Sequence, residues 1–256
     1  MPAPFYKDTN LAELALRGYN VARFVSFSPD GEIRRQMIRQ HAEKKETPHE
    51  AIRFLFENSP TKLVNIRTFQ PEKPKGNPFF SKFSTVDEVL DVINNKALGL
   101  YTIANEFIEP NDGGINGVVL SNLVEFGTGH TPRNVELKGA AQLHVSLFSS
   151  LVKIVYNAYL DIPFGKNNRV EFSVHPNKEG FLQTHTIVWE NEEIGKQSEQ
   201  EIDIRWPNRY SHLLGDKTYG LLVAWLLGLQ VPYTTVISRK LPPFSSGHKH
   251  GNVETG

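Results

Sequence analysis

Three glutamates lie within or beside segments that are otherwise apolar and strand-like. Glu106 and Glu109 flank Phe107-Ile108, and Glu125 follows a β-branched run. A carboxylate buried in such a strand is costly unless a cation, a metal ion or a ligand hydroxyl pairs with it. These glutamates are therefore candidates for binding a metal ion or a nucleotide hydroxyl. The alternative for each is a side chain that points outward from a half-exposed sheet.

A group of cations precedes these glutamates in the chain. The run 63–66 predicts a strand that delivers Arg67, and a polar loop with Lys73, Lys75 and Gly76 follows. Arginine provides a fork of donors and a glycine-containing loop provides backbone N–H groups, a combination that suits a polyphosphate. The alternative is that the two lysines belong to an ordinary solvated loop.

The stretch 101–127 must position the glutamates, and its pattern predicts two or three β-strands. Short apolar and β-branched runs are interrupted by Asn111-Asp112-Gly113-Gly114 and again at 121–122. Asp-Gly and Gly-Gly supply the positive φ that tight reversals need. We therefore predict a hairpin at 111–114.

The other segments mix helical and strand periodicity, which predicts an α+β fold. Thr47 and Glu50 have the spacing of a capping box, with Pro48 at the first helical position. Ser84 or Thr85 caps a later helix. We predict helices at 10–17, 47–58, 84–93, within 135–159 and at 217–227, and strands at 19–27, 63–66, 79–83, 170–175, 181–189 and 233–237.

Composition excludes several classes of function. The 256 residues contain 28 Lys plus Arg and 28 Asp plus Glu, so the formal charge is zero, which disfavours a general electrostatic nucleic-acid binder. Without cysteine there is no disulfide or thiolate metal site, which suits a reducing compartment. No apolar run approaches about 18 residues and no signal pattern opens the chain. We expect a cytoplasmic protein without membrane partners.

The order of parts resembles the nucleotide-binding core of the ATP-grasp family, in the version found in pyruvate phosphate dikinase and phosphoenolpyruvate synthase. A strand with a cation, a loop, a short strand and a capped helix precede Asn105-Glu106-Phe107-Ile108-Glu109, which is similar to the family's EEFIEG strand. The resemblance covers about residues 48–190 and implies an ATP-grasp-like fold with mixed or antiparallel sheets and packed helices. It also implies roles for two sets of residues: the nucleoside is contacted by Glu106, Phe107 and Ile108, and the phosphates by Arg67, Lys73 and Lys75.

The resemblance implies a magnesium ion as well, bound by an acidic residue on a later strand. Glu171 in the alternating run 170–175 takes that place, and Glu125, or in its stead Glu190, is the second carboxylate. Mg²⁺ prefers such hard oxygen ligands. The chain departs from the family in three respects: Arg67 stands where many members have lysine, no asparagine follows Glu171 by two residues, and the phosphohistidine domain is not apparent.

A displaced unit near the C-terminus also resembles the family. Gly215-Asp216-Lys217, followed by an apolar helix and a strand, is similar to the opening of the family's nucleotide domain, where the lysine contacts phosphate at a helix start. In the family this unit comes first. Either the chain is the first half of a tandem protein, or a permuted order lets Lys217 serve the upstream site. Residues 10–27 form a looser copy of the same helix-to-strand unit.

Three functions follow as hypotheses. The first is an ATP- and Mg²⁺-dependent phosphotransferase or ligase with an unknown acceptor, in which Arg67 and Lys217 act on the phosphates. The second is a non-catalytic nucleotide-binding or scaffold module, acting as a homodimer or with a C-terminal partner domain. The third is a nucleic-acid-modifying protein, because cations and aromatic residues interleave between 205 and 219 as in a single-strand platform.

The sequence also suggests a division of the chain. Composition and charge predict an N-terminal unit at 1–46, the core at 47–190 and an acidic linker at 191–204. The displaced unit would occupy 205–244 and a flexible tail 245–256.

Overall fold

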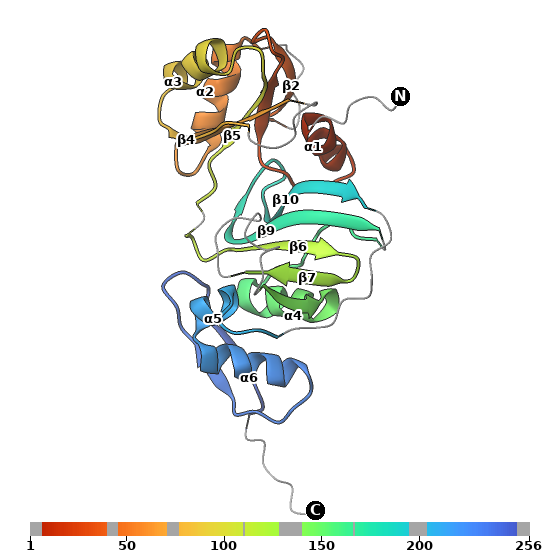
Figure 1. Cartoon of the computed structure of the whole chain (residues 1–256). Helices are drawn as coiled ribbons and strands as arrows, with labels where there is room; N and C mark the ends of the chain where they lie inside the picture. The colour runs from red at the N-terminus through yellow and green to blue at the C-terminus, as the bar shows by residue number, and fades with distance from the viewer. Residues whose placement is uncertain are drawn as a thin grey trace, which may run out of the picture. The chain divides into compact units, whose positions relative to one another are not determined.

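The computed structural model describes residues 7–39, 46–70, 77–109, 111–127, 140–165, 167–194 and 204–249. Its contacts divide the chain into two compact units, the first formed by 1–109 with 179–187 and the second by 110–178 with 188–256. Each unit contains a five-stranded sheet with helices packed on it (Figure 1). The predicted architecture of antiparallel sheets and packed helices is therefore confirmed.

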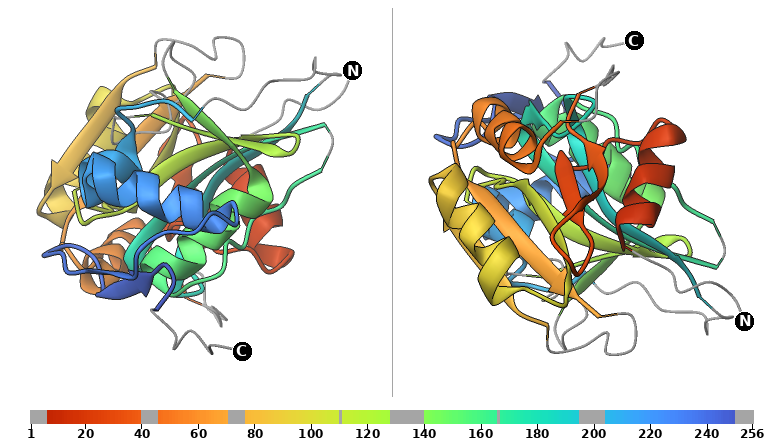
Figure 2. Two further views of the ribbon diagram at one scale, coloured as in Figure 1. Left: turned by 90° about the horizontal axis from the view of Figure 1, so that it is seen from below. Right: turned by 90° about the horizontal axis from the view of Figure 1, so that it is seen from above.

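The sheet of the first unit has the strand order β2-β1-β5-β3-β4, and each neighbouring pair is antiparallel. Helices α2 and α3 contact each other in this unit, and Figure 2 shows them from two further directions. The elements are α1 (Lys7–Leu16), β1 (Phe24–Phe27), β2 (Ile33–Met37), α2 (Pro48–Asn58), β3 (Val64–Phe69), β4 (Phe79–Phe83), α3 (Val86–Asp91) with a π-helical turn (Val92–Lys96), and β5 (Tyr101–Glu106).

The start of α2 follows from its local sequence. The Thr47 side chain accepts a hydrogen bond from the Glu50 backbone N–H at 3.3 Å, and the Glu50 carboxylate accepts one from the Thr47 N–H at 2.9 Å. This is the predicted capping box, with Pro48 at the first helical position. Thr85 and Glu88 form the same arrangement at the start of α3.

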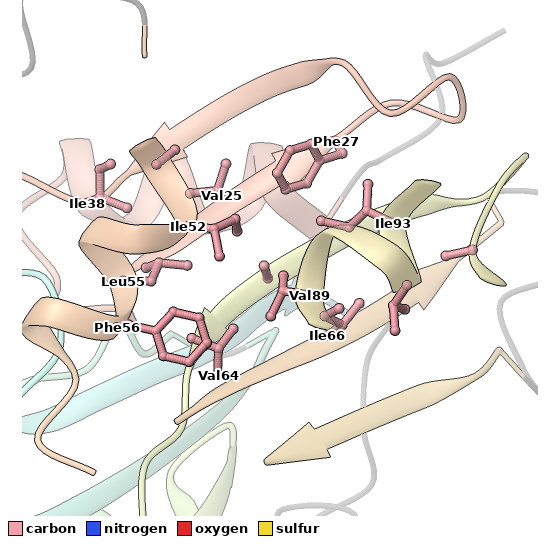
Figure 3. Close-up of a cluster of buried hydrophobic side chains, with 14 residues drawn as sticks. Val25, Phe27, Ile38, Ile52, Leu55, Phe56, Val64, Ile66, Val89 and Ile93 are labelled. Carbon is pink, nitrogen blue, oxygen red and sulfur yellow. The ribbon is translucent and has the colours of Figure 1, made fainter. Parts of the chain in front are cut away.

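The core of the first unit lies between one face of its sheet and helices α2 and α3 (Figure 3). Ile52 and Leu55 of α2 meet Val25 of β1 and Ile66 of β3 there, and all four are fully buried. Because side chains alternate across a strand, the neighbouring residues of β1, β3 and β5 point to the opposite face.

The sheet of the second unit has the order β10-β9-β6-β7-β8, followed in the chain by a two-stranded sheet of β11 and β12. Its elements are β6 (Ile115–Leu120), β7 (Leu123–Phe126), β8 (Ala141–His144), α4 (Val145–Tyr156), β9 (Asn168–Glu179), β10 (Thr184–Glu193), α5 (Arg209–Leu214), α6 (Asp216–Leu226), β11 (Thr234–Val236) and β12 (Phe244–Ser246).

The tip of the β9–β10 hairpin belongs to the first unit, where Asn20 holds it. The Asn20 amide nitrogen donates to the carbonyl oxygens of Glu179 at 2.8 Å and Thr186 at 3.0 Å, and its oxygen accepts from the Leu182 N–H at 2.7 Å. A single buried amide thus satisfies three backbone groups of a segment that is distant in sequence.

One prediction about the elements is wrong. The 111–114 turn does not close a hairpin, because β5 and β6 belong to different sheets, although Gly113 has the expected positive φ of 104°. The Asp112 side chain instead accepts from the Gly114 N–H, which closes a local turn. The helix predicted within 135–159 is confirmed: α4 spans Val145–Tyr156 and begins directly after β8, which pairs with β7.

Two smaller differences concern the predicted linker and tail. Residues 191–193 form the end of β10, and 245–246 lie in β12, so both segments take part in strand pairing. The remainder of the predicted linker at 195–203 and of the tail at 250–256 lies outside the described residues.

Candidate functional site

The sheet of the second unit has one apolar face, which packs on α4. Phe126 of β7 and Phe172 of β9 lie 5.4 Å and 5.7 Å, between ring centroids, from Phe148 of α4. All three rings are fully buried. Because side chains alternate, Glu125 and Glu171 point to the other face of the sheet.

Strand register brings these two glutamates into one row. Val118 of β6 is opposite Glu125 of β7 on one side and opposite Glu171 of β9 on the other. Directly opposed residues project from the same face, and two strand spacings place the two glutamate backbones about 10 Å apart. Gln142 of β8 continues the row beyond Glu125.

Each carboxylate in this row has a polar partner. The Gln142 amide donates to Glu125 Oε1 at 2.5 Å, and the Arg169 guanidinium donates to Glu171 Oε1 at 2.7 Å. Glu125 is buried, whereas the side chain of Glu171 keeps 17% of its exposure. A cation at this row would compete with Arg169 for Glu171.

The donor set suits a hard cation only in part. Carboxylate and amide oxygens are the ligands of Mg²⁺, which commonly takes one or two from the protein and the rest from water and phosphate. Within the described residues, no group of three or more His, Asp or Glu side chains is arranged to hold a metal ion. A cation at this row would therefore need ligands beyond the two carboxylates.

In the first unit, Arg67 lies on the sheet face opposite the core. It is paired with Ile103 of β5 and Phe79 of β4. The neighbouring Ile66 points into the core instead, and Arg67 itself is half-buried. Its guanidinium thus belongs to a face with both aromatic and polar neighbours.

Asn105 lies on the same face and was not predicted as a site residue. It is opposite Asn65, two residues before Arg67 on β3. Asn105 is 4% exposed, and its Oδ1 atom has no hydrogen-bond partner among the described residues, while its amide nitrogen donates to the Glu106 carbonyl oxygen at 2.8 Å. A buried acceptor without a partner costs free energy unless a ligand or water supplies a donor. The signal for Asn105 was its place opposite Asn65, a polar residue two positions before Arg67 on the neighbouring strand β3.

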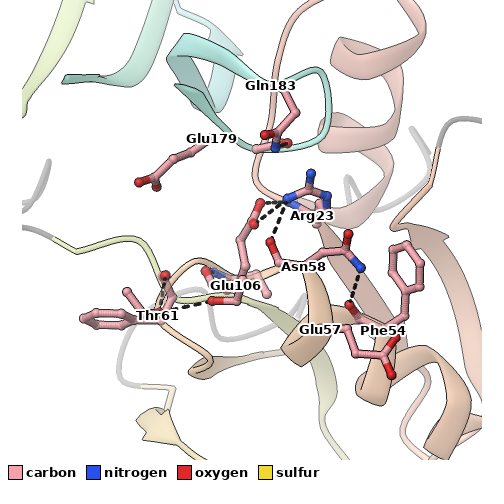
Figure 4. A network of polar contacts seen from close by, with 12 residues as sticks. Arg23, Phe54, Glu57, Asn58, Thr61, Glu106, Glu179 and Gln183 are labelled. Atoms are coloured by element: carbon pink, nitrogen blue, oxygen red, sulfur yellow. Dashed lines mark hydrogen bonds and ion pairs between the residues drawn. The ribbon is translucent and has the colours of Figure 1, made fainter. Parts of the chain in front are cut away.

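Glu106 is engaged inside the protein (Figure 4). Its Oε1 accepts from the Arg23 backbone N–H at 2.7 Å and its Oε2 accepts from the Arg23 guanidinium at 2.8 Å. The side chain is fully buried, and this burial raises the pKa of Glu106, an effect that Arg23 opposes. The carboxylate is therefore an internal ion-pair partner of Arg23.

The backbone groups of Phe107 are also used within the first unit. The Phe107 N–H donates to the Leu63 carbonyl oxygen at 2.9 Å, and its own carbonyl oxygen accepts from the Thr61 hydroxyl at 3.1 Å. Phe107 is buried and Ile108 is half-buried. The resemblance implied that Glu106, Phe107 and Ile108 contact the nucleoside. In the structure, the Glu106 carboxylate and the Phe107 backbone groups already have hydrogen-bond partners within the protein.

The other cations predicted to contact phosphate are Lys217, Lys73 and Lys75. Lys217 is exposed in the first turn of α6, where Gly215 provides no side-chain cap. Lys73 and Lys75 lie outside the described residues. Arg67 and Glu106 belong to the first unit, and Glu125, Glu171 and Lys217 to the second.

A buried polar chain in the second unit has the order of a catalytic triad. Asp112 Oδ2 is 2.8 Å from His175 Nδ1, and His175 Nε2 is 2.8 Å from Ser173 Oγ. The Trp189 indole N–H donates to the same Ser173 oxygen at 2.8 Å. Ser173 is fully buried, so it is not accessible as a nucleophile. The chain of hydrogen bonds instead locks the 111–114 turn to β9 and β10.

The same turn is held by two further buried groups. The Tyr156 hydroxyl donates to the Gly113 carbonyl oxygen at 2.8 Å, and Arg209 Nε donates to the Gly114 carbonyl oxygen at 3.1 Å. Burial raises the pKa of Tyr156 well above its ordinary value, and the Asp112 carboxylate adds to this shift. Both groups therefore act as fixed donors to the turn.

The basic and aromatic segment 205–219 is divided between surface and core: Arg205, Trp206, His212 and Lys217 are exposed, whereas Arg209, Tyr210 and Tyr219 are buried. Tyr210 and Tyr219 are fully buried and stack with ring centroids 5.9 Å apart, and burial raises the pKa of Tyr219 to about 12. Arg209 is also buried, while Trp206 is 42% exposed and contacts Tyr219. These tyrosine rings form core contacts and do not face solvent as stacking platforms would.

Comparison with known proteins adds no assignment. No protein-family model matches the sequence, and no curated protein matches it significantly. Among the described residues, no helix has the length and apolar content to cross a bilayer. The fold and the site together define a mixed α and β protein with antiparallel sheets, one of which carries two glutamates that flank the buried Val118 on the face opposite α4.

Proposed function

We propose that the protein is an ATP- and Mg²⁺-dependent phosphotransferase or ligase of the ATP-grasp type. The observation that carries this proposal is the row in which Glu125 and Glu171 flank Val118 on one sheet face. These residues are distant in sequence, and only strand pairing makes them neighbours. Two carboxylates on one sheet face are suited to a magnesium ion shared with nucleotide phosphates.

The first unit supplies the second element of the proposal. Arg67 offers a guanidinium fork for phosphate oxygens, and Asn105 offers a buried acceptor on the same face. The resemblance adds Lys73, Lys75 and Lys217 as further phosphate contacts. In the second unit, bound Mg²⁺ held by Glu125 and Glu171 would neutralise phosphate charge.

A non-catalytic nucleotide-binding module is the second candidate. The Arg169 guanidinium already neutralises Glu171 at 2.7 Å, and Arg23 occupies both oxygens of Glu106. A protein with these contacts could bind nucleotide through Arg67 without recruiting a metal ion. The two candidates differ in whether nucleotide affinity depends on Mg²⁺.

Calorimetric titration with a non-hydrolysable ATP analogue distinguishes them. We expect micromolar binding with Mg²⁺ that weakens at least tenfold, or about 1.4 kcal/mol, in EDTA and in Glu171→Gln and Arg67→Ala. Glu193→Gln and Arg53→Ala are matched controls, because both residues are exposed in β10 and α2. Binding that is insensitive to EDTA and to Glu171→Gln would favour the module. No binding by the unaltered protein would refute both candidates.

A further inference from the structure

The chain contains an internal repeat spaced by 210 residues. Residues 7–27 align without a gap to residues 217–237. Five of the aligned positions are identical: Lys7 and Lys217, Leu11 and Leu221, Leu16 and Leu226, Gly18 and Gly228, and Val21 and Val231. The sequence similarity is modest, so the local structure decides whether the two segments are equivalent.

In both copies the helix ends in the same way. In the first copy, the Gly18 N–H donates to the Ala15 carbonyl oxygen and the Tyr19 N–H donates to the Leu14 carbonyl oxygen, both at 3.0 Å. The second copy repeats both bonds, from Gly228 to Trp225 at 2.9 Å and from Leu229 to Ala224 at 3.0 Å. Gly18 and Gly228 have φ values of 88° and 84°. This is the left-handed helix stop that glycine favours.

Each helix is followed by an equivalent antiparallel strand pair. In the first copy β1 pairs with β2, and Val25 is opposite Gln36. In the second copy β11 pairs with β12, and Thr235, the counterpart of Val25, is opposite Ser245. The repeated unit is therefore a helix, a glycine stop and a hairpin.

The two copies differ in what covers the first strand of the hairpin. β1 lies between β2 and β5, and β5 pairs with all four of its residues. Within the described chain, β11 pairs only with β12. Phe27 in the first copy is fully buried, whereas its counterpart Ile237 is 85% exposed. Arg23 is 9% exposed, whereas its counterpart Tyr233 is 44% exposed.

We propose that the free edge of β11 is a docking site for an extended strand of a partner polypeptide. The repeat identifies the chemistry of that strand, because the equivalent edge in the first copy accepts β5, Tyr-Thr-Ile-Ala-Asn-Glu, in antiparallel orientation. An edge strand presents unpaired N–H and C=O groups to such a partner. The added strand and its apolar side chains would cover Ile237 and Tyr233.

The partner strand is not β5 of a second copy. β5 is already paired on both edges, with β1 and β3. Pairing of β11 with β11 of a second copy is the competing arrangement, and it predicts a dimer. The repeat favours the partner strand because the first copy places an unlike strand, not another β1, against this edge.

The test uses the full chain and a fluorescently labelled peptide of residues 99–109, which contains the β5 sequence. We expect 1:1 binding by anisotropy, weakened at least tenfold by Ile237→Asp and by Thr235→Pro. Leu16→Asp is the matched control for an exposed leucine in the first copy, since Leu16 is 81% exposed. Ser245→Pro on β12 is the control for the proline. Neither control should change the affinity.

Two results would overturn the proposal. One is absence of peptide binding, or binding that Ile237→Asp leaves unchanged. The other is a dimer of the unaltered chain in sedimentation experiments that Ile237→Asp dissociates, which would assign the edge to a second copy. Ile237 is exposed, so its substitution is compatible with folding, and circular dichroism would verify this. The outcome is independent of nucleotide binding.

Discussion

Removal of the Arg23 side chain should produce a stability loss that depends strongly on pH. Arg23→Met deletes the 2.8 Å ion pair to Glu106 but leaves the backbone N–H bond to Glu106 Oε1. The Glu106 side chain is inaccessible to water, with a relative exposure of 0%. Breaking a buried pair by removing one partner typically costs about 3–5 kcal/mol.

The sign of the pH dependence follows from the pKa. Burial raises the pKa of Glu106 above its ordinary 4.5, and without Arg23 this pKa rises further. A carboxyl group with a raised pKa in the folded state contributes its full stability below the unfolded pKa and loses it as pH rises through the folded pKa.

Urea unfolding of the wild type and Arg23→Met between pH 5 and pH 8 measures this effect. The difference in unfolding free energy should be largest at pH 8 and shrink by up to about 1.4 kcal/mol per pH unit on acidification. Glu106→Gln combined with Arg23→Met should recover part of the loss and remove the pH dependence. A difference below about 1 kcal/mol that is constant with pH would show that the ion pair is not buried as described.

Two other predictions concern local contacts. His175→Ala removes the hydrogen bonds of His175 to Asp112 Oδ2 and to the Ser173 hydroxyl, so we expect a loss of about 2–4 kcal/mol in urea unfolding. The exposed His212→Ala should cost less than about 1 kcal/mol, and equal losses would contradict the buried network. Thr47→Ala removes the α2 cap and should cost about 0.5–2 kcal/mol, with Thr47→Ser restoring most of it, and an unchanged thermal midpoint for Thr47→Ala would argue against the capping box.

The sequence by itself determined the features whose hydrogen bonds close within a few residues. The Thr47–Glu50 box, the Thr85 cap and the glycine stop at Gly228 join groups three to five positions apart. Their geometry depends on local φ and ψ values and on short side chains, so residue types at fixed spacing suffice to predict them. The mixed α and β class followed from the same local periodicities.

Strand pairing was decided only by the tertiary structure. Local turn chemistry predicted a hairpin at 111–114, but β5 instead pairs with β1 and β3. A turn fixes the direction of the chain, whereas the strand that completes a pair is set by burial of a whole sheet face. The hairpin prediction was therefore wrong because the local turn signal at 111–114 competes with pairing of β5 to strands that are distant in sequence.

The candidate site depends on the same distant pairing. The sequence identified Glu106 and Glu125 as unusual carboxylates, and the family resemblance added Glu171. Their partners are remote: Arg23 is 83 residues from Glu106, and pairing with Val118 brings Glu125 and Glu171 into one row. Whether a carboxylate meets a guanidinium or an open face depends on which side chains the other strands present. Residue type could therefore indicate that these glutamates need partners, and only the register of the assembled sheets determined which partners they have.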